Sequence, residues 1–300
     1  MKKTTLITAV MATMLLASCS SEMPTAEQPQ ANTERHPIEL TASIESPASR
    51  ATTDLQSTTV DKSVTLGVFV SKVGGGEPVA SNVKYTFDSN SSPLSWKVAE
   101  GQSPVYFPTD GSPINITIYA PYKDGISDVS NIPTASSFVV KNNQTSDADY
   151  LDSDLIKGSK QDVRYTGTPV DITMQHLLSK VTVTLVPGNS LTIEDLKGAT
   201  MTIGSVSTTL PSDLAADSSS ASQAVILSPS TIASGNEFIS ITLSSGTYFP
   251  YVLPSDLTLE AGKQYTYSFT LKATGISLNT ASVTDWTTGG TFTDGEMKTE

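Results

Sequence analysis

The stretch Tyr265-Thr266-Tyr267-Ser268-Phe269-Thr270-Leu271 indicates how this chain folds. Large side chains alternate with small hydroxyl side chains, which places the two kinds on opposite faces of an extended strand. Aromatic and β-branched residues favour such a pleated, half-buried surface. The same period of two recurs in residues 38–44, 64–70, 114–118, 181–185 and 239–243. The sequence therefore predicts an all-β protein made of many short strands.

Turn residues punctuate these strands and divide the chain. Glycine-containing turns follow or precede the alternating runs, and helical signals are confined to single turns near residues 154–158 and 193–197. Many short strands with such punctuation are typical of antiparallel β-sandwiches. A polar, turn-rich stretch at 157–168 precedes a new set of long strands. We therefore expect two β-sandwich units, residues 36–166 and 167–300, of ordinary domain size.

The first residues have the features of an export signal. Lys2 and Lys3 precede an apolar run from Leu6 to Leu16, which is too short to span a bilayer but has the length of a signal-peptide core. Small residues then lead to Cys19, whose thiol can accept a diacylglyceryl group. We predict a signal peptide at 1–18 and lipidation of Cys19, with the diacyl chain and an added acyl group giving stable membrane anchoring.

Composition restricts the remaining possibilities. Residues 19–35 are polar and proline-containing, which is typical of a disordered tether. The formal net charge of -12 makes the chain a poor binder of nucleic acid through charge. Cys19 is the only cysteine, so an intramolecular disulfide is excluded.

Motifs that carry chemistry are scarce. The two histidines, His36 and His176, are too few for a zinc site, and we expect His176 to pack or hydrogen-bond. No Gly-x-Ser-x-Gly elbow or phosphate-binding loop occurs. The sequence thus predicts no catalytic residue, no cofactor and no enzyme.

One acidic cluster is the best candidate for a metal site. Alternating carboxylates can coordinate Ca²⁺, but the sixth and twelfth positions of an EF-hand loop would be Asp152 and Gly158 instead of glycine and glutamate. A calcium site and a solvated loop remain the alternatives, and no metal site is assigned. The cluster consists of Asp147, Asp149, Asp152 and Asp154.

Four segments together resemble the fimbrillin family, the subunits of outer-membrane pili often called type V. They share the lipobox at Cys19, an aromatic-proline strand end after a tryptophan, a strand pair around a histidine, and a late tyrosine strand before a second tryptophan. In this chain the last three are Trp96 with Pro104–Tyr122, Val170–Val186, and Gly262–Tyr267 with Trp286.

The resemblance implies a fold and a role. The family's fold is two transthyretin-like β-sandwich domains in tandem, and its members are structural subunits of an adhesive fimbrium. Lipidated precursors reach the outer membrane, where an arginine-specific protease removes the N-terminal segment including the first strand. The groove left behind accepts a strand from a neighbouring subunit, which gives homo- or heteropolymers.

The residues needed for this switch can be placed in the chain. Residues 36–50 would be the removable segment, cut between Arg50 and Ala51 in an exposed loop of small residues. Arg35 is the alternative site, but cutting there would leave the strand in place, and the following His36-Pro37 disfavours protease binding. The side chains expected to fill the groove are Ile38, Leu40, Ala42 and Ile44.

A surface-anchored glycan-binding lipoprotein is the alternative function. Such proteins share the lipobox, the acidic composition and tandem sandwiches, and they bind sugars through exposed aromatic rings. Tyr248, Phe249 and Tyr251 around Pro250 would form such a platform, or else pack the end of the sandwich.

Overall fold

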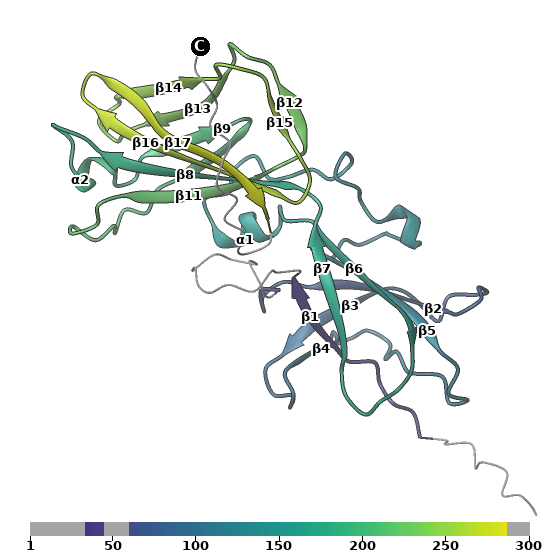
Figure 1. Cartoon of the computed structure of the whole chain (residues 1–300). Coiled ribbons are helices and arrows are strands. Elements are labelled where there is room, and N and C mark those ends of the chain that lie inside the picture. The colour runs from purple at the N-terminus through teal and green to yellow at the C-terminus, as the bar shows by residue number, and fades with distance from the viewer. Residues whose placement is uncertain (1–33, 45–59, 287–300) are drawn as a thin grey trace, which may run out of the picture.

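The computed structural model describes residues 34–44 and 60–286, and within them the fold is all-β with several sheets. Figure 1 shows the strands gathered in two units, with β1–β7 in one and β8–β17 in the other. Each unit has its own large cluster of buried apolar side chains. Two short α-helices, α1 (Asp147–Leu151) and α2 (Ile193–Leu196), and a 3-10 turn at Val129–Asn131 complete the regular structure.

The first unit is a closed ring of seven strands in the order β1-β4-β3-β2-β5-β6-β7. Alternation explains its core: along β7, every second side chain is buried and the ones between are exposed. Gly67 in β2 is required by packing, since a Cβ there would lie 2.0 Å from the ring of Tyr119. The strands are β1 (Leu40–Ile44), β2 (Leu66–Lys72), β3 (Ala80–Asp88), β4 (Ser95–Val98), β5 (Ile114–Ala120), β6 (Ile156–Val163) and β7 (Val170–His176).

Strand β1 is the element that closes this ring. It runs parallel to β7 from Leu40↔Val170 to Ile44↔Met174, and antiparallel to β4 at Leu40↔Trp96. The sequence predicts a sandwich of two separate sheets for this first unit. The ladder closes instead because β1 supplies a partner to the edges of both β4 and β7, and closure removes free sheet edges.

The second unit is built from two four-stranded sheets whose facing side chains share one core, with order β10-β9-β13-β14 and β11-β8-β16-β17. A small sheet, β12-β15, lies beside them. The strands are β8 (Ser179–Pro187), β9 (Thr200–Ile203), β10 (Val206–Thr209), β11 (Ala221–Leu227), β12 (Ser230–Ile232), β13 (Glu237–Thr242), β14 (Tyr248–Val252), β15 (Leu257–Leu259), β16 (Lys263–Lys272) and β17 (Gly275–Asp285).

The change from one core to the other comes later in the chain than the sequence suggested. Strand β7 pairs with β1 and β6, and its buried side chains belong to the first core, so the change falls between His176 and Ser179 and not between residues 166 and 167. The polar stretch 157–168 is the exposed strand β6 and its turn into β7, and not a linker.

One of the two helical turns predicted from the sequence is present in the structure. Thr192 begins α2 through a capping box with Asp195, as expected near residues 193–197. The turn expected at 154–158 is wrong, because β6 already begins at Ile156, and the helix lies earlier, where Ser146 accepts a hydrogen bond from the Asp149 N–H. In the described ranges, no helix has the length and hydropathy needed to cross a bilayer.

Candidate functional site

The slot that holds β1 is the most completely built site in the first unit. The four alternating side chains predicted to fill a groove are all buried, with exposed fractions of 1% for Ile38, 0% for Leu40, 9% for Ala42 and 3% for Ile44. They belong to the same cluster as the inner side chains of the other six strands. A strand with this alternation therefore completes the core and does not merely cover it.

Backbone groups hold β1 and its approach on both sides. The Ile38 N–H donates to the Val105 carbonyl at 2.8 Å, and the Val170 N–H donates to the Glu39 carbonyl at 2.8 Å. The His36 carbonyl accepts from the Phe107 N–H at 3.0 Å. Removing the segment would leave these neighbours unpaired along the edges of the slot.

Tyr85 adds a buried side-chain contact to β1. Its hydroxyl donates to the Ile38 carbonyl at 3.0 Å, and the side chain has no exposed surface. Burial, together with the charge of nearby Glu39, raises the pKa of Tyr85 well above its ordinary value. The phenol therefore stays protonated and remains a donor at the bottom of the slot.

Polar pairs border the outer face of β1. Thr41 Oγ1 donates to Asp171 Oδ1 at 3.0 Å on β7, and Ser95 Oγ donates to Glu39 Oε2 at 3.3 Å on the β4 side. These exposed or half-buried contacts fix the register of β1 by the side chains that face solvent.

Contacts with the barrel surface hold the segment around Arg35, the alternative cleavage site. Its guanidinium lies 5.7 Å from the centre of the Tyr106 ring, Pro37 forms a bridge with Tyr106, and the His36 ring stacks on Tyr165 at 3.7 Å. A protease needs an extended segment that is free to leave the surface.

Cys19, Arg50 and Ala51 lie outside the described residues.

Strand β17 is a second element of interest, because it lies at the edge of its sheet and pairs only with β16 among the described strands (Figure 1). Its inward residues stand opposite the tyrosine-rich strand β16. Two of them remain partly exposed, with exposed fractions of 38% for Leu278 and 52% for Val283. The inward set is Ile276, Leu278, Ala281 and Val283, opposite Leu271, Phe269, Tyr267 and Tyr265.

The segment 38–44, which contains β1, matches β17 in sequence. Residues 38–44 read Ile-Glu-Leu-Thr-Ala-Ser-Ile, and residues 276–283 read Ile-Ser-Leu-Asn-Thr-Ala-Ser-Val. With Asn279 set aside, five of the seven positions are identical and valine replaces the last isoleucine. Sequence reasoning missed this match because the extra residue breaks the period of two; a comparison of the chain with itself that allows one gap would have found it.

The acidic cluster is divided by the fold. Asp154 is fully buried, with its Oδ1 at 2.8 Å from His176 Nδ1, whereas Asp149 and Asp152 face Lys141 at 3.9 and 3.7 Å. The carboxylates do not converge, and within 34–44 and 60–286 no group of three acidic, histidine or cysteine side chains is placed to hold a metal ion. His176 stacks on Trp286 with ring centres 3.6 Å apart, in agreement with the packing role predicted for it.

The aromatic residues of β14 do not form a sugar platform. Phe249 is buried, and Tyr251 packs edge-on against Phe269. Only Tyr248 is exposed, and its hydroxyl bonds to Glu237. Alternation along the strand sends neighbouring rings to opposite faces, so the three rings cannot act together.

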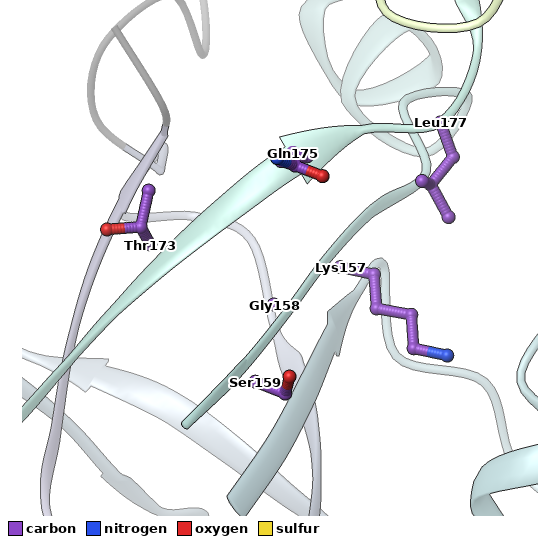
Figure 2. Close-up of a pocket in the computed structure, with 6 residues that line it drawn as sticks. All are labelled: Lys157, Gly158, Ser159, Thr173, Gln175 and Leu177. Atoms are coloured by element: carbon purple, nitrogen blue, oxygen red, sulfur yellow. The ribbon is translucent and has the colours of Figure 1, made fainter. Parts of the chain in front are cut away.

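One polar pocket lies on the barrel where β6 and β7 separate after three paired residues (Figure 2). Its cavity is about 520 Å³ and brings together no catalytic pair. The lining residues are Lys157, Gly158, Ser159, Thr173, Gln175 and Leu177.

Known proteins resemble this chain over most of its length. A family model described as fimbrillin-like matches residues 49–286. A protein of Bacteroides uniformis named as fimbrium subunit Fim1C is 25% identical over 310 residues, which cover 96% of this chain and 97% of that protein.

Two solved structures share the fold. A protein of Bacteroides uniformis described as a cell adhesion protein aligns with a TM-score of 0.55 and 21% identity over 87% of this chain and 100% of that one. A second protein with the same description, from Bacteroides ovatus, aligns with a TM-score of 0.59 and 14% identity over 86% of this chain and 100% of that one.

Proposed function

The chain belongs to the fimbrillin-like family, and from this premise we propose that it is a structural subunit of an adhesive cell-surface fimbrium, assembled by proteolysis-triggered strand exchange. The observation that carries the proposal is β1: one short strand closes the barrel, is buried along its inner face, and lies before the region matched by the family model. Because the site holds a strand of the protein chain, it supports a structural role and not a catalytic one. The two units would be the tandem transthyretin-like domains of such a subunit.

Before cleavage, β1 keeps the precursor monomeric. With the slot filled, neither β4 nor β7 offers an edge to another chain. After cleavage at Arg50–Ala51 by an arginine-specific protease, β1 is no longer covalently attached and its return competes with a strand from another subunit. Each large side chain that refills the slot is worth about 1.5–3 kcal/mol, and each ladder hydrogen bond about 0.5–1.5 kcal/mol.

Strand β17 of a neighbouring subunit is our candidate for the incoming strand. It repeats the inward set of β1 in the same order and exposes part of it in its own unit. Leu278 and Val283 are partly exposed in their own unit, so burying them in the slot would remove apolar surface from water. Because slot and donor lie at different places on the subunit, the contact is head-to-tail and extends into a filament of identical or related subunits.

The same cleavage releases the subunit from the membrane. The signal peptide 1–18 directs export, Cys19 carries the lipid at the outer membrane, and residues 19–35 form the tether. Cutting after Arg50 would separate the lipid, the tether and β1 from the mature subunit as one piece.

Mutation of the cleavage site tests the proposal. Arg50→Ala should give a lipidated monomer in the membrane fraction, whereas Arg35→Ala, the matched control, should still give heat-stable oligomers that start at Ala51. Surface fractions would be compared by unheated gel electrophoresis, and the N-terminus by mass. Assembly of Arg50→Ala at the wild-type level, or a mature N-terminus other than Ala51, would refute the proposed switch.

A further inference from the structure

We propose that Asn279 is a specificity-determining residue, which makes β17 fit its own sheet better than the slot of β1 and so delays strand exchange; this inference rests on the proposed function. Asn279 is the one residue by which β17 departs from the pattern of β1. Along the β16–β17 ladder, Ser268 is opposite Thr280 and Phe269 is opposite Leu278. Asn279 therefore has no opposite residue and forms a β-bulge.

Side chains of β16 hold this bulge in place. Thr270 Oγ1 donates to Asn279 Oδ1 at 3.0 Å, and Asn279 Nδ2 donates to Ser268 Oγ at 3.4 Å. The bulge also restores the phase of the strand, because Ile276 and Leu278 before it and Ala281 and Val283 after it all stand opposite inward residues of β16. The ladder with β16 is thus matched to a strand that has one extra residue.

The slot of β1 is matched to a strand without it. The β1–β7 ladder runs without a register shift from Leu40↔Val170 to Ile44↔Met174. At the position of the extra residue, between Leu40 and Thr41, the facing residues on β7 are Val170 and Asp171. They offer no pair of hydroxyl groups like Ser268 and Thr270, and the Asp171 carboxylate already accepts from Thr41.

The two environments therefore favour different strands. In the slot, β17 either keeps its bulge without the two anchoring hydrogen bonds, or loses the bulge and turns one half of its apolar set away from the core. Either outcome lowers its affinity for the slot. Asn279 consequently keeps β17 on its own sheet until a vacant slot is available, while the flanking residues still identify the slot as its destination.

Peptide competition tests this inference. The full chain would be trimmed with trypsin, the cut confirmed by mass, and the release of the β1 fragment followed as a peptide is added. A peptide of residues 275–286 is compared with the same peptide lacking Asn279. The control lacks Ser282 instead, which turns Val283 to the opposite face, and a peptide of residues 34–44 serves as the reference occupant.

The expected order separates this inference from the proposal on which it rests. Deletion of Asn279 should improve displacement of β1 about tenfold, equivalent to about 1.4 kcal/mol, and the peptide lacking Ser282 should be weaker than both. Equal or better displacement by the wild-type peptide would overturn the role of Asn279 while supporting β17 as donor. If only the 34–44 peptide exchanges, both the donor assignment and this inference are overturned, but strand exchange is not.

A full-length variant supplies a second readout. Asn279→Ala keeps the extra residue but loses both anchoring hydrogen bonds, so the amides of β17 should exchange faster with deuterium, and its peptide should bind the slot no better than wild type. Unchanged amide exchange in β17 would show that the side chain does not hold the bulge and would overturn the inference.

Discussion

At the scale of single residues, the slot of β1 depends on polar atoms as much as on apolar ones. Tyr85 is fully buried, and its hydroxyl donates a hydrogen bond to the Ile38 carbonyl. A buried acceptor that loses its donor costs more than the hydrogen bond itself contributed. The aliphatic pattern of residues 38–44 could be predicted from the sequence, but the partner of the Ile38 carbonyl could not, because Tyr85 lies 47 residues away.

We predict that Tyr85→Phe weakens the hold on β1. The variant keeps the ring in the core but leaves the Ile38 carbonyl without this donor, which should lower the free energy of unfolding by about 1–3 kcal/mol. Chemical denaturation of the uncleaved chain measures the change. Tyr122→Phe is the control, because the Tyr122 hydroxyl bonds to the exposed Asp124, and its loss should have little effect. Equal stability of the two variants would contradict a special role for the buried phenol.

At the scale of elements, alternation predicted strands well and their partners poorly. All six alternating stretches identified from the sequence overlap strands of the structure. Strand β7 belongs to the first unit, because the polar stretch 157–168, after which the sequence placed the boundary, is largely the exposed strand β6, which pairs with β7. Period two reports which faces are buried, but pairing between distant strands, such as β1 with β7, depends on contacts that a local pattern does not contain.

Four aspartates at strand ends, turns and helix starts give the chain a pH dependence. A hydrogen bond from the Lys97 side chain lowers the pKa of Asp88. A hydrogen bond from the backbone N–H of Ser112 lowers the pKa of Asp110. Hydrogen bonds from Ser130 lower the pKa of Asp128, and the Thr192 N–H lowers that of Asp195. All four carboxylates are better stabilised as anions when the chain is folded.

We predict that stability falls in acid because of these four groups. A lowered pKa contributes stability above the unfolded value, about 3.9, and this contribution is lost as the pH falls through the folded values. The melting temperature should therefore be steady near neutral pH and decline below about pH 4. Replacing the four aspartates by asparagine should flatten the decline, because it lowers the melting temperature at pH 7 toward the value that the wild-type chain has in acid. A decline of unchanged slope would assign the acid sensitivity to other groups.

At the scale of the whole molecule, the two units are joined by buried contacts and not by a loose linker. The Gln144 side chain accepts from the Ile226 N–H at 2.7 Å and donates to the Ile226 carbonyl at 2.9 Å. Trp286, which follows the last strand of the second unit, belongs to the core cluster of the first. In the proposed assembly, such a joint would fix the direction in which one subunit presents its slot and its edge strand.

Trp286 is the residue whose loss should separate the two units. Its ring is 2% exposed, stacks on His176, and lies beneath Lys180 Nζ, which is 5.9 Å from the ring centre. His176 Nδ1 is itself hydrogen-bonded to Oδ1 of the buried Asp154, so the tryptophan covers a buried polar pair as well as apolar side chains. Replacing a large buried ring by alanine typically costs about 3–5 kcal/mol.

Trp286→Ala should therefore divide one cooperative transition into two. We expect calorimetry of the wild-type chain to show a single unfolding peak, since each unit loses contacts when the other unfolds. In the variant, the units should melt separately and the first peak should move to lower temperature. Tyr248→Ala is the control, because that side chain is 51% exposed on β14, away from the joint, and should leave the single peak intact. If Trp286→Ala still unfolds in one peak at the wild-type temperature, Trp286 does not couple the unfolding of the two units.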